Sequence, residues 1–169
     1  MGRLSRSEFD VLKSELAEEI ERVADHNMMR IGFSGLAKRR GAIALELIQN
    51  ALDAGADTAS FDFDDEGLVF EHNGEGALNK KCVKALCQWA KTTKKWDSVG
   101  FMGIGFKSFI HYFQTVEISG FGWKFRIHVG MDNRLPSLPD TMKPEWDDDI
   151  SEPQDDMTTR FKFTNMRNE

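Results

Sequence analysis

The sequence predicts an α+β fold in two layers, with helices packed on one face of a mixed, mainly antiparallel sheet. Two observations predict this class. Apolar residues recur at helical spacing in several segments, and between these segments lie short stretches in which apolar and polar residues alternate, as in half-buried strands. The 169 residues, of which 40% are hydrophobic and 30% charged, suffice for one globular domain with a sizeable core. We expect a single domain over residues 1–169, which would also suit a piece of a larger protein.

The helices are predicted from apolar residues spaced three and four positions apart. They are expected over residues 7–24, 41–54, 79–90 and 104–113. The first belongs to an N-terminal helical segment that we expect over residues 1–30. The second ends at Gly55, because glycine is favoured just past the C-terminus of a helix.

The strands are predicted from regular alternation beside tight turns. They are expected over residues 59–63, 67–70, 115–119, 123–129 and 158–164, with the first two joined as a hairpin. All four prolines fall between residues 134 and 157, at Pro136, Pro139, Pro144 and Pro153. This segment is therefore expected to be an irregular, acidic surface loop.

The charge of the chain does not predict a partner. The formal net charge is −6, but residues 140–157 alone hold eight acids and one base, so the remainder carries 20 acids and 21 bases. This balance gives no support to nucleic-acid binding. No apolar stretch reaches the ~18–20 residues of a membrane span, and the N-terminus lacks the apolar core of a secretion signal. Cys82 and Cys87 lack the spacing of a metal site, so we expect a reduced, cytoplasmic protein with no membrane partner, and a nuclear location is the alternative.

The helix expected over residues 41–54 carries a stripe of polar side chains. Glu46, Asn50 and Asp53 follow one another at i, i+4 and i+7 and share one side of the helix. An amide oxygen such as that of Asn50 suits Mg²⁺, and Glu46 one turn earlier could accept a proton from an attacking water. The plainer interpretation is the polar stripe of any amphipathic helix. The buried face of the helix expected over residues 41–54 is predicted to consist of Leu45, Ile48 and Leu52.

A glycine-spaced run occupies residues 99–108, Val-Gly-Phe-Met-Gly-Ile-Gly-Phe-Lys-Ser. Its glycines leave backbone N–H groups uncovered where a helical pattern begins, and such groups favour an anion. Lys107 and Ser108 add a cation and a hydroxyl. The run predicts a loop that closes over the phosphates of a nucleotide, and the alternative is a glycine-rich hinge.

A third motif, Phe70-Glu-His-Asn-Gly-Glu-Gly76, lies between the helix and the glycine run. Two glycines one residue apart let the backbone approach a flat ligand closely. The alternative is an ordinary Asn-Gly turn between a strand and a helix.

In their order along the chain, these three motifs resemble those of the GHKL ATPases, the superfamily of gyrase B, the ninety-kilodalton heat-shock chaperones, histidine kinases and MutL, which share the Bergerat fold. The similarity covers about residues 37–129 and the last strand, and it is greatest to the chaperone and sacsin-type branch. The resemblance implies a Bergerat-type sandwich that binds ATP and Mg²⁺.

The resemblance also implies a role for each matching position. Glu46 matches the water-activating carboxylate and Asn50 the Mg²⁺-coordinating amide, with Asp53 near them. Gly74 and Gly76 match the glycines that shape the adenine pocket. The remaining matches are a lid over residues 91–104, a phosphate-contacting Lys94, a lid segment around the phosphates made of Gly100, Phe101, Met102, Gly103, Ile104, Gly105, Phe106 and Lys107, and a threonine at the adenine end, Thr158 or Thr159.

One position departs from the pattern of the family. Many members have an aspartate that accepts a hydrogen bond from the adenine amino group, and this chain has His72 there, followed by Asn73. A neutral imidazole nitrogen or the Asn73 oxygen would have to accept that bond, and both are weaker acceptors than a carboxylate.

These observations predict Mg²⁺-dependent ATP binding and slow ATP hydrolysis by a nucleotide-gated switch with a mobile lid. A protein partner or an attached domain would respond to the lid, and hydrolysis would depend on that partner or on a nucleotide-dependent homodimer. The alternative is a nucleotide-binding interaction module without hydrolysis. A histidine or serine-type protein kinase is less favoured, because the segments around Asp53 and Lys107 resemble the chaperone branch more closely.

Overall fold

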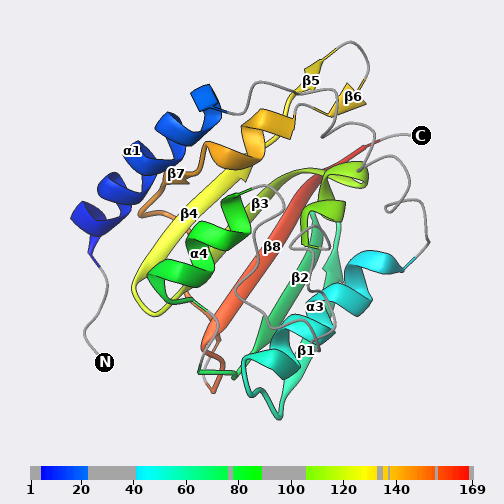
Figure 1. Ribbon diagram of the computed structural model, residues 1–169. Helices are drawn as coiled ribbons and strands as arrows, with labels where there is room; N and C mark the ends of the chain where they lie inside the picture. Colours follow the sequence, from blue (N-terminus) through cyan, green and yellow to red (C-terminus); the bar gives the residue numbers. More distant parts are fainter. Residues whose placement is uncertain are drawn as a thin grey trace.

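The computed structural model describes residues 5–22, 41–75, 78–88, 106–132, 135–136, 138–154 and 156–167. Within these ranges the chain combines helices with a six-stranded antiparallel sheet, so the predicted α+β class is confirmed (Figure 1). Every described strand pair of this sheet is antiparallel, whereas the sequence had suggested a mixed sheet.

Three α-helices and two 3₁₀ helices lie in the described ranges: α1 (Arg6–Arg22), α3 (Ala42–Asp53), α4 (Lys80–Cys87), η1 (Phe106–His111) and η2 (Leu138–Met142). The first three confirm predicted helices. Helix α4 begins where the Asn79 side chain accepts a hydrogen bond from the backbone N–H of Cys82 at 2.9 Å, an N-cap that satisfies one free donor. The segment predicted to be helical over 104–113 is a 3₁₀ helix of six residues in its described part.

The main sheet has the order β1-β2-β8-β3-β4-β7. Its strands are β1 (Ala59–Asp64), β2 (Gly67–His72), β3 (Phe113–Gly120), β4 (Trp123–His128), β7 (Glu145–Trp146) and β8 (Thr159–Met166), and β5 (Met131–Asp132) pairs with β6 (Leu135–Pro136) separately. The last strand of the chain, β8, is inserted between β2 and β3, as the red arrow of Figure 1 shows. This insertion joins the two halves of the sheet.

The helices lie on one side of the sheet in Figure 1, and the core lies on that side. Alternate residues of β8, Phe161 and Phe163, pack against Phe106 of η1 with tilted rings, at ring-centroid distances of 5.7 and 6.4 Å. Phe9 of α1 packs against Trp123 of β4 at 6.0 Å. These contacts hold the helices against the sheet by burying aromatic surface.

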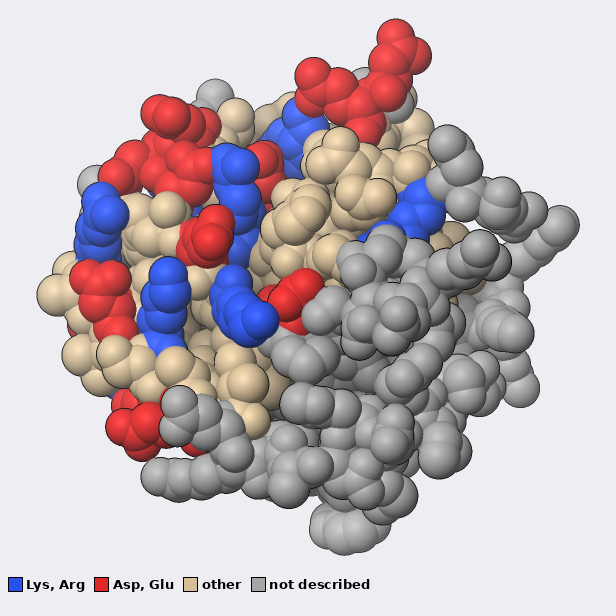
Figure 2. Space-filling model, turned by 90° about the horizontal axis from the view of Figure 1, so that it is seen from above, with Lys and Arg blue, Asp and Glu red and all other residues tan. Residues whose placement is uncertain are grey.

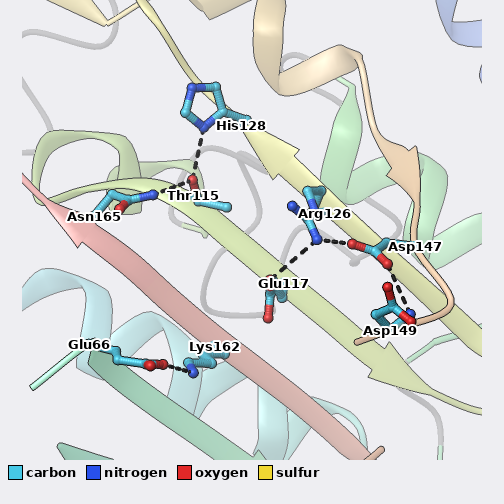
Figure 3. Close-up of polar contacts among 9 residues, drawn as sticks. All are labelled: Glu66, Thr115, Glu117, Arg126, His128, Asp147, Asp149, Lys162 and Asn165. Atoms are coloured by element: carbon cyan, nitrogen blue, oxygen red, sulfur yellow. Dashed lines mark hydrogen bonds and ion pairs between the residues drawn. The ribbon is translucent and has the colours of Figure 1, made fainter. Parts of the chain in front are cut away.

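The residues that alternate with this core carry charges and hydroxyls on the other side of the sheet (Figure 3). Arg126 of β4 forms ion pairs with Glu117 of β3, at 3.8 Å, and with Asp147, and Lys162 of β8 pairs with Glu66. Such exposed or half-exposed pairs are each worth at most about 1 kcal/mol.

The acidic segment over residues 134–157 is more ordered than the sequence predicts. Its described residues include η2 and β7, and β7 pairs with β4 at the edge of the main sheet. Ile150 is buried, and the Ser119 hydroxyl donates to the carbonyl oxygen of Ser151 at 2.6 Å. The prolines and acids predicted an irregular loop, whereas the segment contains η2 and β7, and the buried Ile150 anchors it to the sheet.

The buried face of α3 differs from the prediction. Ile43, Leu47 and Ala51 are buried. The residues expected there are instead exposed, at 70% for Leu45, 40% for Ile48 and 59% for Leu52. The helix has two apolar stripes, and the one that faces the core contains small residues at its C-terminal end, where the backbone after β2 approaches closely.

Candidate functional site

The motif after β2 lies directly against the C-terminal end of α3. A Cβ atom at Gly74 would be 2.9 Å from both the Cβ and the carbonyl oxygen of Ala54, closer than real side-chain contacts. Only glycine fits there without displacing the end of the helix. Two of the three predicted motifs are therefore in contact, and Gly74 is the residue that permits it.

The polar stripe of α3 adjoins its buried face. Glu46 and Asn50 are half-buried, next to the buried Leu47, whereas Asp53 is exposed and accepts a hydrogen bond from the Gln49 amide at 3.0 Å. Helix α3 also contacts η1, the described end of the glycine run. Glu46 and Asn50 thus share the boundary of the core, and Asp53 stands apart from them as one member of a surface pair.

The side chain of Asn73 forms hydrogen bonds with the turn between α3 and β1. Its side-chain oxygen accepts hydrogen bonds from the N–H groups of Asp57 and Thr58, both at 3.1 Å, and its amide nitrogen donates to the Asp57 carboxylate at 2.5 Å. The bonds from Asn73 and Thr58 lower the pKa of that carboxyl. The Asn73 oxygen, one of the two acceptors expected to bind the adenine amino group, is therefore engaged in holding the α3–β1 turn.

His72, the other expected acceptor, is 1% exposed and sits at the end of β2. Its Nδ1 atom accepts a hydrogen bond from the N–H of Gly74 at 3.1 Å. Burial lowers the pKa of the imidazole to about 4, so the ring is neutral at physiological pH. A neutral ring whose Nδ1 is an acceptor carries its proton on Nε2.

Thr159 lies opposite His72 in the β2–β8 register. Its side chain is fully buried, and its hydroxyl has no hydrogen-bond partner among the described residues. The neighbouring Thr158 is satisfied, because its hydroxyl donates to the carbonyl oxygen of Gly74 at 2.9 Å. Of the two threonines expected at the base end, Thr158 shapes the turn and Thr159 offers an unused polar group.

In η1, the side chains of the glycine run point into the protein. Phe106 belongs to the aromatic core, and Lys107 is 1% exposed, in electrostatic contact with Cys87 of α4. Burial lowers the pKa of the Lys107 ammonium to about 8 and raises the pKa of the Cys87 thiol to about 12. The buried Ser108 hydroxyl has no partner among the described residues.

Several predicted site residues lie outside the described ranges and remain predictions. They are Gly76, Lys94, Gly100, Phe101, Met102, Gly103, Ile104 and Gly105, together with the lid expected over residues 91–104.

Sequence reasoning missed two contributors to this site, Asp57 and Ala54. Asp57 holds the Asn73 amide, and Ala54 provides the small surface against which Gly74 packs. The Asp-Ala-Gly-Ala run at the end of α3 could have indicated the role of Ala54, because small residues at the end of a helix let another backbone segment approach closely.

Asn50 and Glu46 have side chains of the chemical type that a magnesium–triphosphate group requires. Asn50 offers an amide oxygen and Glu46 a carboxylate one turn away, and Mg²⁺ needs few protein ligands because water and phosphate complete its octahedron. Among the described residues there is no group of three or more His, Cys, Asp and Glu side chains that could hold a metal ion. The hydroxyls of Thr159 and Ser108 are buried and have no hydrogen-bond partner among the described residues, and such groups are uncommon in proteins.

Comparison with known proteins adds no family assignment, because no family model and no curated protein matches the chain. Among the described helices, none combines the length and apolar character that crossing a bilayer requires. Seen from above, the described surface intersperses acidic and basic side chains and has no large patch of one sign (Figure 2).

Proposed function

We propose that this chain binds a purine nucleoside triphosphate with Mg²⁺, hydrolyses it slowly and acts as a nucleotide-gated switch. The family resemblance implies ATP as the nucleotide. The observation that carries the proposal is the meeting of distant motifs beside one helix. Gly74 packs on the end of α3, α3 contacts η1, and His72 lies opposite Thr159. Two of the segments that resemble nucleotide-binding motifs, and the described end of the third, are thereby adjacent in the fold as well as ordered in the sequence.

In this proposal, Asn50 and Glu46 of α3 each have one task. Asn50 holds the magnesium ion, which when bound neutralises phosphate charge and orients the triphosphate. Glu46 accepts a proton from the attacking water, since a carboxylate at the edge of the core is partly desolvated yet within reach of solvent. The glycine run supplies backbone N–H groups to the phosphates, and the side chains at its described end, Phe106, Lys107 and Ser108, are buried and do not reach them.

Calorimetric titration with Mg²⁺ and a non-hydrolysable ATP analogue tests the binding step. We expect saturable binding that Asn50→Ala weakens at least about tenfold, because Mg²⁺·nucleotide loses a ligand. Leu45→Ala is the matched control, since Leu45 is an exposed residue on the opposite side of the same helix. Equal binding by wild type and Asn50→Ala would overturn the role of Asn50, and no binding of any nucleotide would overturn the proposal.

Phosphate release tests the hydrolysis step. We expect Glu46→Gln to abolish turnover and to retain nucleotide affinity, because the amide preserves shape but cannot accept the proton. Glu18→Gln on α1 is the control for loss of one exposed carboxylate. Retained turnover in Glu46→Gln would remove Glu46 from the mechanism.

The switch function depends on a partner. We propose that nucleotide binding orders the lid expected over residues 91–104, and that a second copy, a partner protein or an attached domain responds to it in the cytoplasm. Both cysteines are free thiols, which is compatible with a reducing compartment. If the partner is a second copy, the specific rate of phosphate release should rise with protein concentration, and a constant specific rate would contradict dimer-dependent catalysis.

A further inference from the structure

The imidazole of His72 is held in one tautomer by the backbone of its own turn. The N–H of Gly74 donates to Nδ1 at 3.1 Å, in a buried position. Turning the ring to present Nδ1 elsewhere would leave that N–H without its partner, and unsatisfied buried donors are costly. The close packing of Gly74 on Ala54 fixes the position of the N–H as well.

The neutral ring therefore offers a donor where the family motif offers an acceptor. Burial holds the pKa of His72 near 4, so the ring is neutral throughout the physiological range. Because Nδ1 accepts from the N–H of Gly74, the proton of this neutral ring is on Nε2. The Asn73 oxygen cannot replace the missing acceptor, because it already accepts from the N–H groups of Asp57 and Thr58.

The residue opposite His72 on the neighbouring strand carries a hydroxyl that can accept. Thr159 is directly opposite His72 across the β2–β8 pair, and its buried Oγ1 has no partner among the described residues. A threonine hydroxyl can serve as donor or acceptor, so it adapts to the group it meets.

We propose that the base-reading position of the nucleotide site is complementary to a 6-oxopurine, the base of a guanosine or inosine triphosphate, and not to adenine. This inference rests on the proposed nucleotide binding and specifies its base. O6 of the purine would accept from Nε2–H of His72, and N1–H would donate to Oγ1 of Thr159. Adenine presents the reverse pattern, because its 6-amino group is a donor and its N1 an acceptor.

The test is calorimetric titration with Mg²⁺ and the β,γ-imido triphosphates of adenosine, guanosine and inosine. We expect the guanosine and inosine compounds to bind about tenfold more tightly than the adenosine compound. Their O6 atom gains a hydrogen bond from Nε2–H of His72, whereas the 6-amino group of adenine would place a second donor against that N–H. Inosine isolates the 6-position because it lacks the 2-amino group of guanosine. Equal or tighter binding of the adenosine compound overturns the inference and leaves the proposed function standing. Tight binding of the guanosine compound alone has the same two consequences, because the preference would then come from the 2-amino group and not from the 6-position. Failure of all three to bind overturns the proposed function itself.

Variants at the same position sharpen the test. His72→Asp places a carboxylate acceptor there and should shift the ratio of affinities at least about tenfold toward adenosine. His128→Asn is the control, because His128 is an exposed residue of β4 that contacts Thr115 at 2.9 Å and should leave the ratio unchanged. An unchanged ratio in His72→Asp would overturn the inference.

Long-range ¹H–¹⁵N NMR of the imidazoles tests the tautomer without any ligand and does not require the aspartate variant to fold. The chain has four histidines, so the His72 signals can be assigned from their loss in His72→Asn. We expect the Nε2-protonated form. An Nδ1-protonated ring would present Nε2 as an acceptor and overturn the inference.

Discussion

Replacing Lys107 with methionine should remove a pH dependence of stability that burial of this ammonium creates. Lys107 is 1% exposed in η1, and its pKa is lowered from 10.5 to about 8 by desolvation, with the nearby Cys87 thiol acting in the opposite direction. Between pH 8 and 10.5 the unfolded chain holds a proton that the folded chain has released. The free energy of unfolding therefore rises with pH in this window.

The magnitude follows from both buried groups. Burial raises the pKa of Cys87 from 9.0 to about 12, so above pH 9 the folded chain keeps a proton that the unfolded chain loses, and this lowers stability. From pH 7 to pH 9 the lysine contribution is roughly three times the opposing thiol contribution, which leaves a net rise of about 1 kcal/mol. Lys107→Met should lose this rise, and at pH 7 it should be more stable by as much as about 3 kcal/mol.

Urea unfolding, followed by tryptophan fluorescence at pH 7, 8 and 9, measures this difference. Lys13→Met is the matched control, because Lys13 is exposed on α1 and its replacement should preserve the wild-type rise. A Lys107→Met variant that keeps the rise would refute the burial of this ammonium. If the variant is stabilised and still binds nucleotide, the Lys107 side chain is not needed for phosphate binding, and the glycine run would contact the phosphates through its backbone.

Four further substitutions test the packing around the site. Leu47→Ala should lower the free energy of unfolding by about 2–5 kcal/mol because Leu47 is fully buried, whereas Leu52→Ala should change it by less than about 0.5 kcal/mol, and chemical denaturation distinguishes the two. Gly74→Ala should cost about 1–3 kcal/mol in thermal or urea unfolding, since its Cβ would meet the end of α3, and an unchanged stability would mean that the two segments are not in contact. Glu71→Gln should cost about 2 kcal/mol, because the buried carboxylate accepts from Arg160 at 3.0 Å, and a neutral result in the same assay would show that water compensates the guanidinium.

Local patterns were sufficient to predict where most helices and strands lie. The hairpin of β1 and β2 followed from alternation and a turn, and α1 followed from helical spacing. The position of β8 in the middle of the sheet could not be predicted in this way, because alternation describes one strand and not its neighbours. The 3₁₀ form of η1 was equally hidden, since apolar residues three and four apart suit either kind of helix.

The face of α3 shows why period alone was insufficient for the site. The helix has two apolar stripes, and the prediction chose the one with the larger side chains, Leu45, Ile48 and Leu52, which the structure leaves exposed. The stripe that is buried ends in alanines, because the backbone at Gly74 must approach it closely. Packing against a segment some twenty residues away therefore decided which stripe faces inward, and with it that Glu46 and Asn50 border the core.

Residue type alone also leaves open what a polar site can recognise. A histidine in place of an acidic base reader could be an acceptor or a donor, depending on which nitrogen the protein has already used. Here the backbone N–H of Gly74 uses Nδ1, and Asn73 is used by the turn before β1. In the site we propose, base selectivity would then depend on the geometry of one turn, because the same side chain in a turn without that N–H would be free to accept. A change of base preference would in that case require no new residue in contact with the base, only a shift of the glycine that fixes the ring.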